Sequence, residues 1–229
     1  MISHRKIAVI VGLLFIIATL TPLLSAIPLS DIPLGSLGSE GNPDYLMAVS
    51  INQSQVLLGV FLLLVMTAAI VSIPILVYPI LKRNDEILGL GYVGSRIFEA
   101  IFSVLNIIGI LSLLSLSRAF VSAGTPDASY FQTQGALLLA NLNWGSILLD
   151  VPFTIGALVF YYLLYKATLV PRWLSGFGLI AAALWLATVP FRMFDFLPSS
   201  LEILALPIAA QEMVLAFWLI AKGFNTNGE

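Results

Sequence analysis

The chain has no cysteine and one histidine, and these two shortages exclude several kinds of chemistry. Without cysteine there is no disulfide, no thiolate metal site and no cysteine nucleophile. The histidine, His4, lies next to the N-terminus, where it cannot serve a haem or zinc site deep in the fold. A buried serine activated by histidine is excluded for the same reason. We therefore expect no metal and no cofactor.

Charge is also scarce. Charged residues make up 10% of the 229 residues, against about 25% in a typical soluble domain. Hydrophobic residues make up 59%, the mean hydropathy is +1.03 and the net charge is −2, with no basic tail. This composition is typical of an integral membrane protein with almost no mass outside the membrane. Membrane lipids are therefore the expected partners and nucleic acid is not, while oligomer formation is left open.

Long apolar runs replace the missing charge. About 20 apolar residues cross the hydrocarbon core, and six runs meet this length. We predict an all-α fold: a polytopic membrane protein with one domain, 1–229, of six transmembrane helices in one bundle. The predicted spans are about 7–27, 56–81, 87–116, 144–165, 176–196 and 201–221.

Two segments next to these spans need separate interpretation. The loop 28–55 is rich in Pro, Gly, Ser and Asn, and we expect it to be long and extracytoplasmic. The segment 131–143 has the pattern of an amphipathic stretch before the fourth span. The first run, after a basic start, also fits a cleaved signal peptide, but it is longer than the usual apolar region, so we favour a retained helix.

Lys and Arg alone predict the orientation, because cytoplasmic loops carry an excess of them. The N-terminus has two, the hairpin at 82–86 has two, the hairpin at 166–172 has two and the C-terminal end has one. The other face has Arg118 and the partly embedded Arg192. Six helices with both termini cytoplasmic satisfy this asymmetry.

One glycine motif is a false signal. Gly89, Gly91 and Gly94 spell the dinucleotide-binding fingerprint, but that fingerprint follows a strand and opens a helix in a βαβ unit. Here no strand precedes the glycines and they open a membrane helix. We expect them instead to allow close packing of helices, as small residues do in membranes.

The third span contains two charges in its apolar interior, Arg96 and Glu99. A charge at the centre of such a helix costs about 3 kcal/mol even on the lenient insertion scale, and residues three apart share one helical face. At 1.5 Å per residue, Arg96 lies roughly 15 Å from Glu86, and Glu212 of the last span lies roughly 15 Å from Lys222. We therefore expect Arg96, Glu99 and Glu212 to meet near the midplane.

This cluster is the candidate site for a ligand or an ion, with Asn106 and Gln211 as hydrogen-bonding neighbours. Two carboxylates against one guanidinium leave one acid unpaired, and that acid must bind a proton, a cation or a polar ligand. The alternative is an ion pair that only fixes the third helix to the sixth.

Asp150 and Arg192 form a second candidate polar pair in the outer half of the predicted bundle. Arg192 can instead extend to the outer interface beside Asp195, as long cationic side chains do, and the sequence favours this second interpretation.

Three segments carry a resemblance to a known family: Arg96-x-x-Glu99, the segment YKATLVPRWLS at 165–175 and the segment EMVLAFWLIAKGF at 212–224. The chain resembles, over nearly its whole length, a bacterial family catalogued as domain of unknown function 4386. The resemblance implies a multi-pass protein of the bacterial cytoplasmic membrane. It carries no known activity, so it implies no catalytic residue.

The function that these observations favour is a small membrane protein that binds or moves a small solute or a proton at the Arg–Glu–Glu cluster. The alternative is a structural or regulatory membrane subunit that uses the cluster only for packing. An intramembrane lipid-modifying enzyme is third, because two acids can run acid–base chemistry but their spacing does not favour it. We expect a non-enzymatic role.

Overall fold

The computed structural model describes residues 3–30, 32, 45–124, 128–194, 196 and 203–225. These residues form helices and no strands. The helices, in chain order, are α1 (His4–Ala26), α2 (Tyr45–Ile51), α3 (Gln53–Leu81), α4 (Glu86–Ala123), α5 (Ala128–Lys166), α6 (Arg172–Met193) and α7 (Leu206–Ala221). A single 3₁₀ turn at 203–205 precedes α7.

Six of the described helices are long and apolar enough to cross a membrane, and α2 is the exception. The prediction of an all-α protein with six membrane helices is confirmed. Local signals explain several helix ends. The Asp85 side chain accepts a hydrogen bond from Leu88 N and starts α4, and Pro207 lies in the first turn of α7, where its missing N–H costs nothing.

The structure corrects two predicted boundaries. The region 28–55 is not one continuous loop, because it contains α2 and the beginning of α3; residues 31 and 33–44 within it lie outside the described part. The segment 131–143 is not separate from the fourth span but belongs to the same helix, α5, which begins at Ala128. One face of this part of α5 packs on α4, and that contact sustains the helix where hydropathy falls.

Each of the six long helices packs against two others so that the pairs close a ring. Going around the ring, the packed neighbours are α1 with α3, α3 with α4, α4 with α5, α5 with α6, α6 with α7 and α7 with α1. At Gly12 of α1 the backbone of α7 comes close, since an added Cβ would lie 2.7 Å from the carbonyl oxygen of Ala216. Glycine therefore lets α1 and α7 touch, and their contact places Thr19 against the candidate site.

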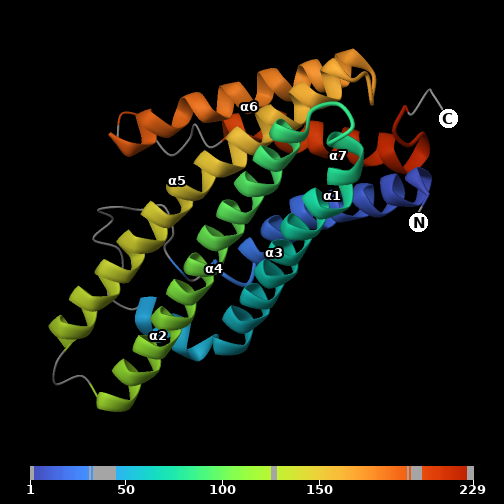
Figure 1. The fold of residues 1–229 in the computed structure, drawn as a ribbon. Helices are drawn as coiled ribbons and strands as arrows, with labels where there is room; N and C mark the ends of the chain where they lie inside the picture. The colour runs from blue at the N-terminus through green and yellow to red at the C-terminus, as the bar shows by residue number, and fades with distance from the viewer. Residues whose placement is uncertain are drawn as a thin grey trace.

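Two hydrophobic cores stabilise this arrangement. The larger core fills the ring, with Phe15, Tyr92 and Phe160 among its fully buried aromatic side chains. The second core lies where α4 and α5 extend beyond the shorter helices and pack with α2 and the start of α3 (Figure 1). At 1.5 Å per residue α4 and α5 are about 57 and 58 Å long, nearly twice the hydrocarbon thickness of about 30 Å.

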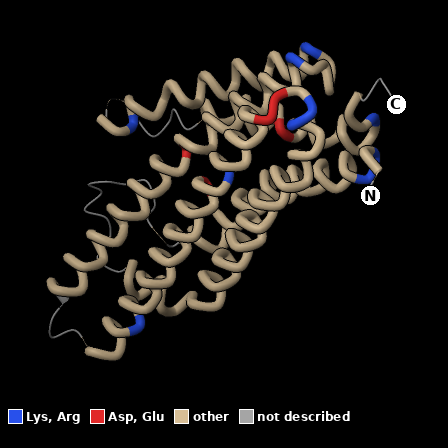
Figure 2. The backbone as a smooth tube through the Cα atoms, in the orientation of Figure 1, with Lys and Arg blue, Asp and Glu red and all other residues tan. Residues whose placement is uncertain are grey.

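Both described chain ends lie at the same end of the ring, together with most of the basic residues (Figure 2). Arg5 joins them, since its guanidinium donates to the carbonyl oxygens of Leu219, Ile220 and Ala221 at 2.6–3.2 Å. It thereby caps the C-terminal carbonyl groups of α7. The segments at this end are the beginning of α1, the hairpin between α3 and α4, the hairpin between α5 and α6 and the end of α7 (Figure 1), and their basic residues are Arg5, Lys6, Lys82, Arg83, Lys166, Arg172 and Lys222. Their gathering at one end is the asymmetry on which the predicted cytoplasmic orientation depends.

The glycine prediction is wrong for two positions. No atom of the described residues lies within 4 Å of the place where a Cβ would sit on Gly91 or Gly94, and Gly89 makes only an ordinary contact with Tyr78. The glycines that permit close packing are elsewhere, at Gly12 and at the contacts between α4 and α5 described below.

Candidate functional site

The candidate site is built around Arg96, on the face of α4 that points into the ring. Its Nη1 donates a 2.8 Å hydrogen bond to Oε2 of Glu99, one helical turn further along the same helix. Both residues are 3% exposed. The spacing of three residues creates this pair locally, and the surrounding helices remove it from the membrane and from water.

Glu212, on α7, approaches the pair from the opposite side of the ring. Its Oε1 lies 3.9 Å from Arg96 Nη2, which is an ion pair but is too long for a hydrogen bond. Its Oε2 accepts a 3.0 Å hydrogen bond from the hydroxyl of Thr19 on α1. The structure thus brings the three predicted charged residues together inside the ring. Glu99 is the tight partner of Arg96, and Glu212 is the loosely paired acid.

Aromatic rings enclose the guanidinium. The Cζ atom of Arg96 lies 5.5 Å from the ring centre of Tyr92 and 5.4 Å from that of Phe153. Such cation–π contacts stabilise a desolvated cation by about 2 kcal/mol. Two buried polar atoms here, Arg96 Nε and the Tyr92 hydroxyl, have no hydrogen-bond partner among the described residues. Unpartnered buried donors are rare in proteins, and here they lie beside a surplus carboxylate.

The two predicted neighbours behave differently. Gln211 is fully buried next to Glu212, but its Nε2 donates to the carbonyl oxygen of Leu174 on α6 at 3.3 Å, and its Oε1 has no partner. Asn106 is about 15 Å further along α4 than Arg96. Its Oδ1 lies against Gly145 of α5, 2.1 Å from where a Cβ would sit. The structure therefore does not bring Asn106 to the cluster.

Asp150 and Arg192 form the second polar pair, between α5 and α6. The Nη2 atom of Arg192 donates to Oδ2 of Asp150, and the guanidinium also stacks over the ring of Trp185 at 4.6 Å. The favoured interpretation, in which Arg192 extends to the interface, is therefore wrong for this side chain. Asp195, its suggested partner there, lies outside the described residues.

The chemistry open to the main cluster follows from its charges. If both acids are ionised, the cluster carries one net negative charge in a buried site. A proton on Glu212 removes that charge, and so does a cation. No group of three or more metal-ligating side chains occurs in the described part of the chain, and the guanidinium repels a metal ion. A proton or a small polar solute is the ligand that this donor set fits.

Thr19, Tyr92 and Phe153 complete the site and were not predicted. Tyr92 could have been predicted from the sequence, since it lies four residues before Arg96 and so shares its helical face. Thr19 could not have been predicted, because no sequence pattern relates a threonine in an apolar helix to an acid 193 residues away. Phe153 could not have been predicted either, because nothing in the sequence distinguishes it from the other phenylalanines among the fourteen.

Two of the segments that carried the resemblance also meet in space. Asn225, just after the segment 212–224, donates from its backbone N to the carbonyl oxygen of Leu169 at 2.7 Å. Its side-chain amide donates to the carbonyl oxygen of Thr168 at 3.2 Å, and Phe224 is buried in the same core as Leu169 and Val170. The two segments therefore form one structural unit at the basic end of the ring.

Comparison with known proteins gives one result. No curated protein and no solved structure matches the chain. Residues 10–223 match the model of the family described as domain of unknown function (DUF4386). This match covers nearly the whole chain and includes the cluster, five of the six long helices in full and α1 from residue 10 onward. The chain is therefore a multi-pass membrane protein that belongs to the DUF4386 family.

Proposed function

We propose that this protein resides in a bacterial cytoplasmic membrane, with both termini cytoplasmic, and that its Arg96–Glu99–Glu212 cluster binds a proton at Glu212 and passes it across the membrane. The observation that carries the proposal is the unequal pairing of the two acids. Glu99 takes the short hydrogen bond from Arg96, whereas Glu212 is left at 3.9 Å and has only a neutral hydroxyl as its close partner.

A buried, loosely paired carboxylate such as that of Glu212 lowers the stability of the folded protein. Moving an isolated carboxylate out of water costs several kcal/mol even after relaxation of the protein. The guanidinium offsets this cost for one acid. Protonation offsets it for the second, and Thr19 can donate to either form because a protonated Glu212 keeps an acceptor oxygen.

A small polar solute is a second candidate ligand. The unpartnered Arg96 Nε and Tyr92 hydroxyl support it, because both can donate a hydrogen bond to an acceptor brought next to Glu212. Proton binding and solute binding at one cluster would then be linked, since the charge on Glu212 changes the affinity for the solute.

The packing alternative rests on a different observation. Thr19, Arg96 and Glu212 come from three different helices, and α4 and α7 are not among the extensively packed neighbours in the ring. A cluster that joins helices across the middle of the ring can stabilise the fold without any ligand. This role and a ligand role predict different effects of a neutral, isosteric change at Glu212.

The test uses the full chain reconstituted in liposomes that contain a pH-sensitive dye. An applied pH gradient should decay faster with the wild-type chain than with Glu212→Gln, which keeps the shape of the side chain and removes its ionisation. Glu86→Gln is the matched control, because Glu86 is an exposed acid at the start of α4. Equal decay for wild type and Glu212→Gln, with both variants folded, would favour the packing role.

A further inference from the structure

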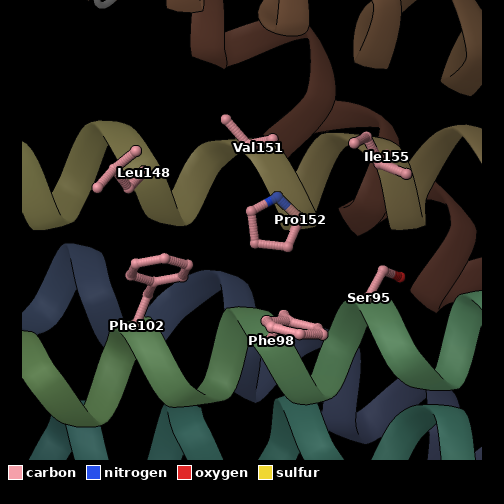
Figure 3. Close-up of a pocket in the computed structure, with 7 residues that line it drawn as sticks. All are labelled: Ser95, Phe98, Phe102, Leu148, Val151, Pro152 and Ile155. Atoms are coloured by element: carbon pink, nitrogen blue, oxygen red, sulfur yellow. The ribbon is translucent and has the colours of Figure 1, made fainter.

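A second feature of the membrane-spanning part is an apolar groove between α4 and α5, on the outward side of the ring (Figure 3). Its volume is about 380 Å³, within the range of small-molecule sites. From α4 it is lined by Ser95, Phe98 and Phe102. From α5 it is lined by Leu148, Val151, Pro152 and Ile155.

The groove exists because α4 and α5 touch closely at two points and separate between them. At one point an added Cβ on Gly156 would lie 2.4 Å from the Ser95 hydroxyl, and at the other a Cβ on Gly145 would lie 2.1 Å from Asn106 Oδ1. The two contacts are eleven residues apart on each helix, about 16 Å. Pro152 lies between them on α5, and an interior proline bends a helix.

The lining is apolar and open to the membrane. Phe98 is 61% exposed and Ile155 45% exposed. The one hydroxyl in the lining, that of Ser95, already donates to the carbonyl oxygen of Tyr92 within α4, so the groove offers no free donor. Arg96 and Glu99 lie on the inward face of the same helix, so the groove is separate from the candidate proton site.

The medium that covers this surface in a membrane is hydrocarbon. Ser95 to Phe102 lie about 14–24 Å along α4 from Glu86, inside a hydrocarbon core about 30 Å thick. A partner helix with its side chains is about 10–12 Å across, so a 10 Å length of it occupies roughly 900 Å³. This volume exceeds that of the groove, about 380 Å³, so a partner helix could insert only single side chains. One linear apolar chain, in contrast, can lie along the groove between its two closed ends.

We propose that this groove is a binding site for one acyl chain of a phospholipid from the surrounding bilayer. The chain lies along α4 and α5 past Pro152, between the Ser95–Gly156 contact and the Asn106–Gly145 contact. The contact of Asn106 with Gly145 then closes the outer end of the groove.

The test is native mass spectrometry of the full chain, purified from membranes in a mild detergent. The wild-type chain should retain one phospholipid after delipidation that removes loosely bound lipid. Val151→Phe fills the centre of the groove, and Leu148→Trp fills it from the rim in case the first variant does not fold. Each should reduce the retained phospholipid at least tenfold.

The matched controls are Ile101→Phe and Ile101→Trp, which enlarge an exposed side chain of α4 outside the lining. They should retain lipid as the wild type does, with circular dichroism confirming the helix content of every variant. A wild-type chain that retains no phospholipid overturns the proposal. So do filled variants that retain as much lipid as the controls, or a wild-type dimer that the filled variants convert to monomer without any change in bound lipid.

Discussion

Thr19 and Glu212 are joined by a 3.0 Å hydrogen bond between the first and the last helix of the ring. The bond connects residues that are 193 positions apart and completes the surroundings of an acid whose ion pair with Arg96 is loose. The site is thus assembled by closure of the ring, since α4 supplies the cation, α7 the surplus acid and α1 the hydroxyl.

Arg96→Leu should be strongly destabilising. Removing one partner of a buried ion pair leaves an uncompensated charge and costs about 3–5 kcal/mol. The double variant Arg96→Leu/Glu99→Leu removes both members of the tight pair, so it should be more stable than Arg96→Leu alone. Chemical unfolding of the purified chain in detergent measures both. Arg118→Leu, at an exposed position on the same helix, is the control and should change stability by less than about 1 kcal/mol. A double variant less stable than Arg96→Leu would contradict the pairing.

Asp150 and Arg192 should be energetically coupled. Asp150→Ala and Arg192→Ala should each destabilise the protein, and the double variant should cost less than the sum, with an interaction energy of about 0.5–3 kcal/mol. The same unfolding assay supplies the double-mutant cycle. Strictly additive losses would mean that the contact between these side chains contributes nothing to stability.

Arg5→Ala should loosen the C-terminal end of α7. The variant loses three hydrogen bonds to the last carbonyl groups of α7, and a cation at a helix C-terminus typically contributes about 0.3–1 kcal/mol. Hydrogen exchange of the amides near 219–222 should accelerate. Lys6→Ala, the adjacent basic residue, is the control and should leave exchange at α7 unchanged. Equal protection in the two variants would rule out the capping role.

The orientation of the protein can be tested directly because the chain has no native cysteine. A cysteine at Ala128, at the beginning of α5, should react with a membrane-impermeant thiol reagent in intact cells. One at Asn84, in the basic hairpin between α3 and α4, should react only after the cells are opened. A cysteine at Gly38 should label from outside as well, although this position lies outside the described residues. Labelling of intact cells at Asn84 alone would reverse the assignment.

The cluster could be predicted in part because depth is easy to count along a membrane helix. Arg96 and Glu99 share a helical face by their spacing, and the rise per residue places Glu212 at the depth of Arg96. Depth does not tell which way a side chain points around the helix axis. Asn106 was misplaced for another reason, since it lies about 15 Å further along α4 than Arg96 and contacts Gly145 of α5.

The remaining features depend on packing that no local pattern encodes. The first part of α5 contains Gln132, Gln134 and Asn141, and this fall in hydropathy makes the predicted span begin only near Trp144. In the structure the helix begins at Ala128, because its first part packs on α4. Arg192 could not be placed because a partner on another helix and the free interface are equally accessible to a long side chain. The structure decides between them through Trp185 and Asp150.

Infrared difference spectroscopy of the reconstituted chain at neutral pH tests most directly whether Glu212 binds a proton. The C=O stretch of a protonated carboxylic acid is distinct from the bands of a carboxylate, and replacing one acid by its amide identifies its source. The spectrum of wild type minus Glu212→Gln should contain a protonated carboxylic acid band, and that of wild type minus Glu86→Gln should not. If the first difference spectrum contains only carboxylate bands, Glu212 is ionised in the folded protein and the proposed proton site is wrong.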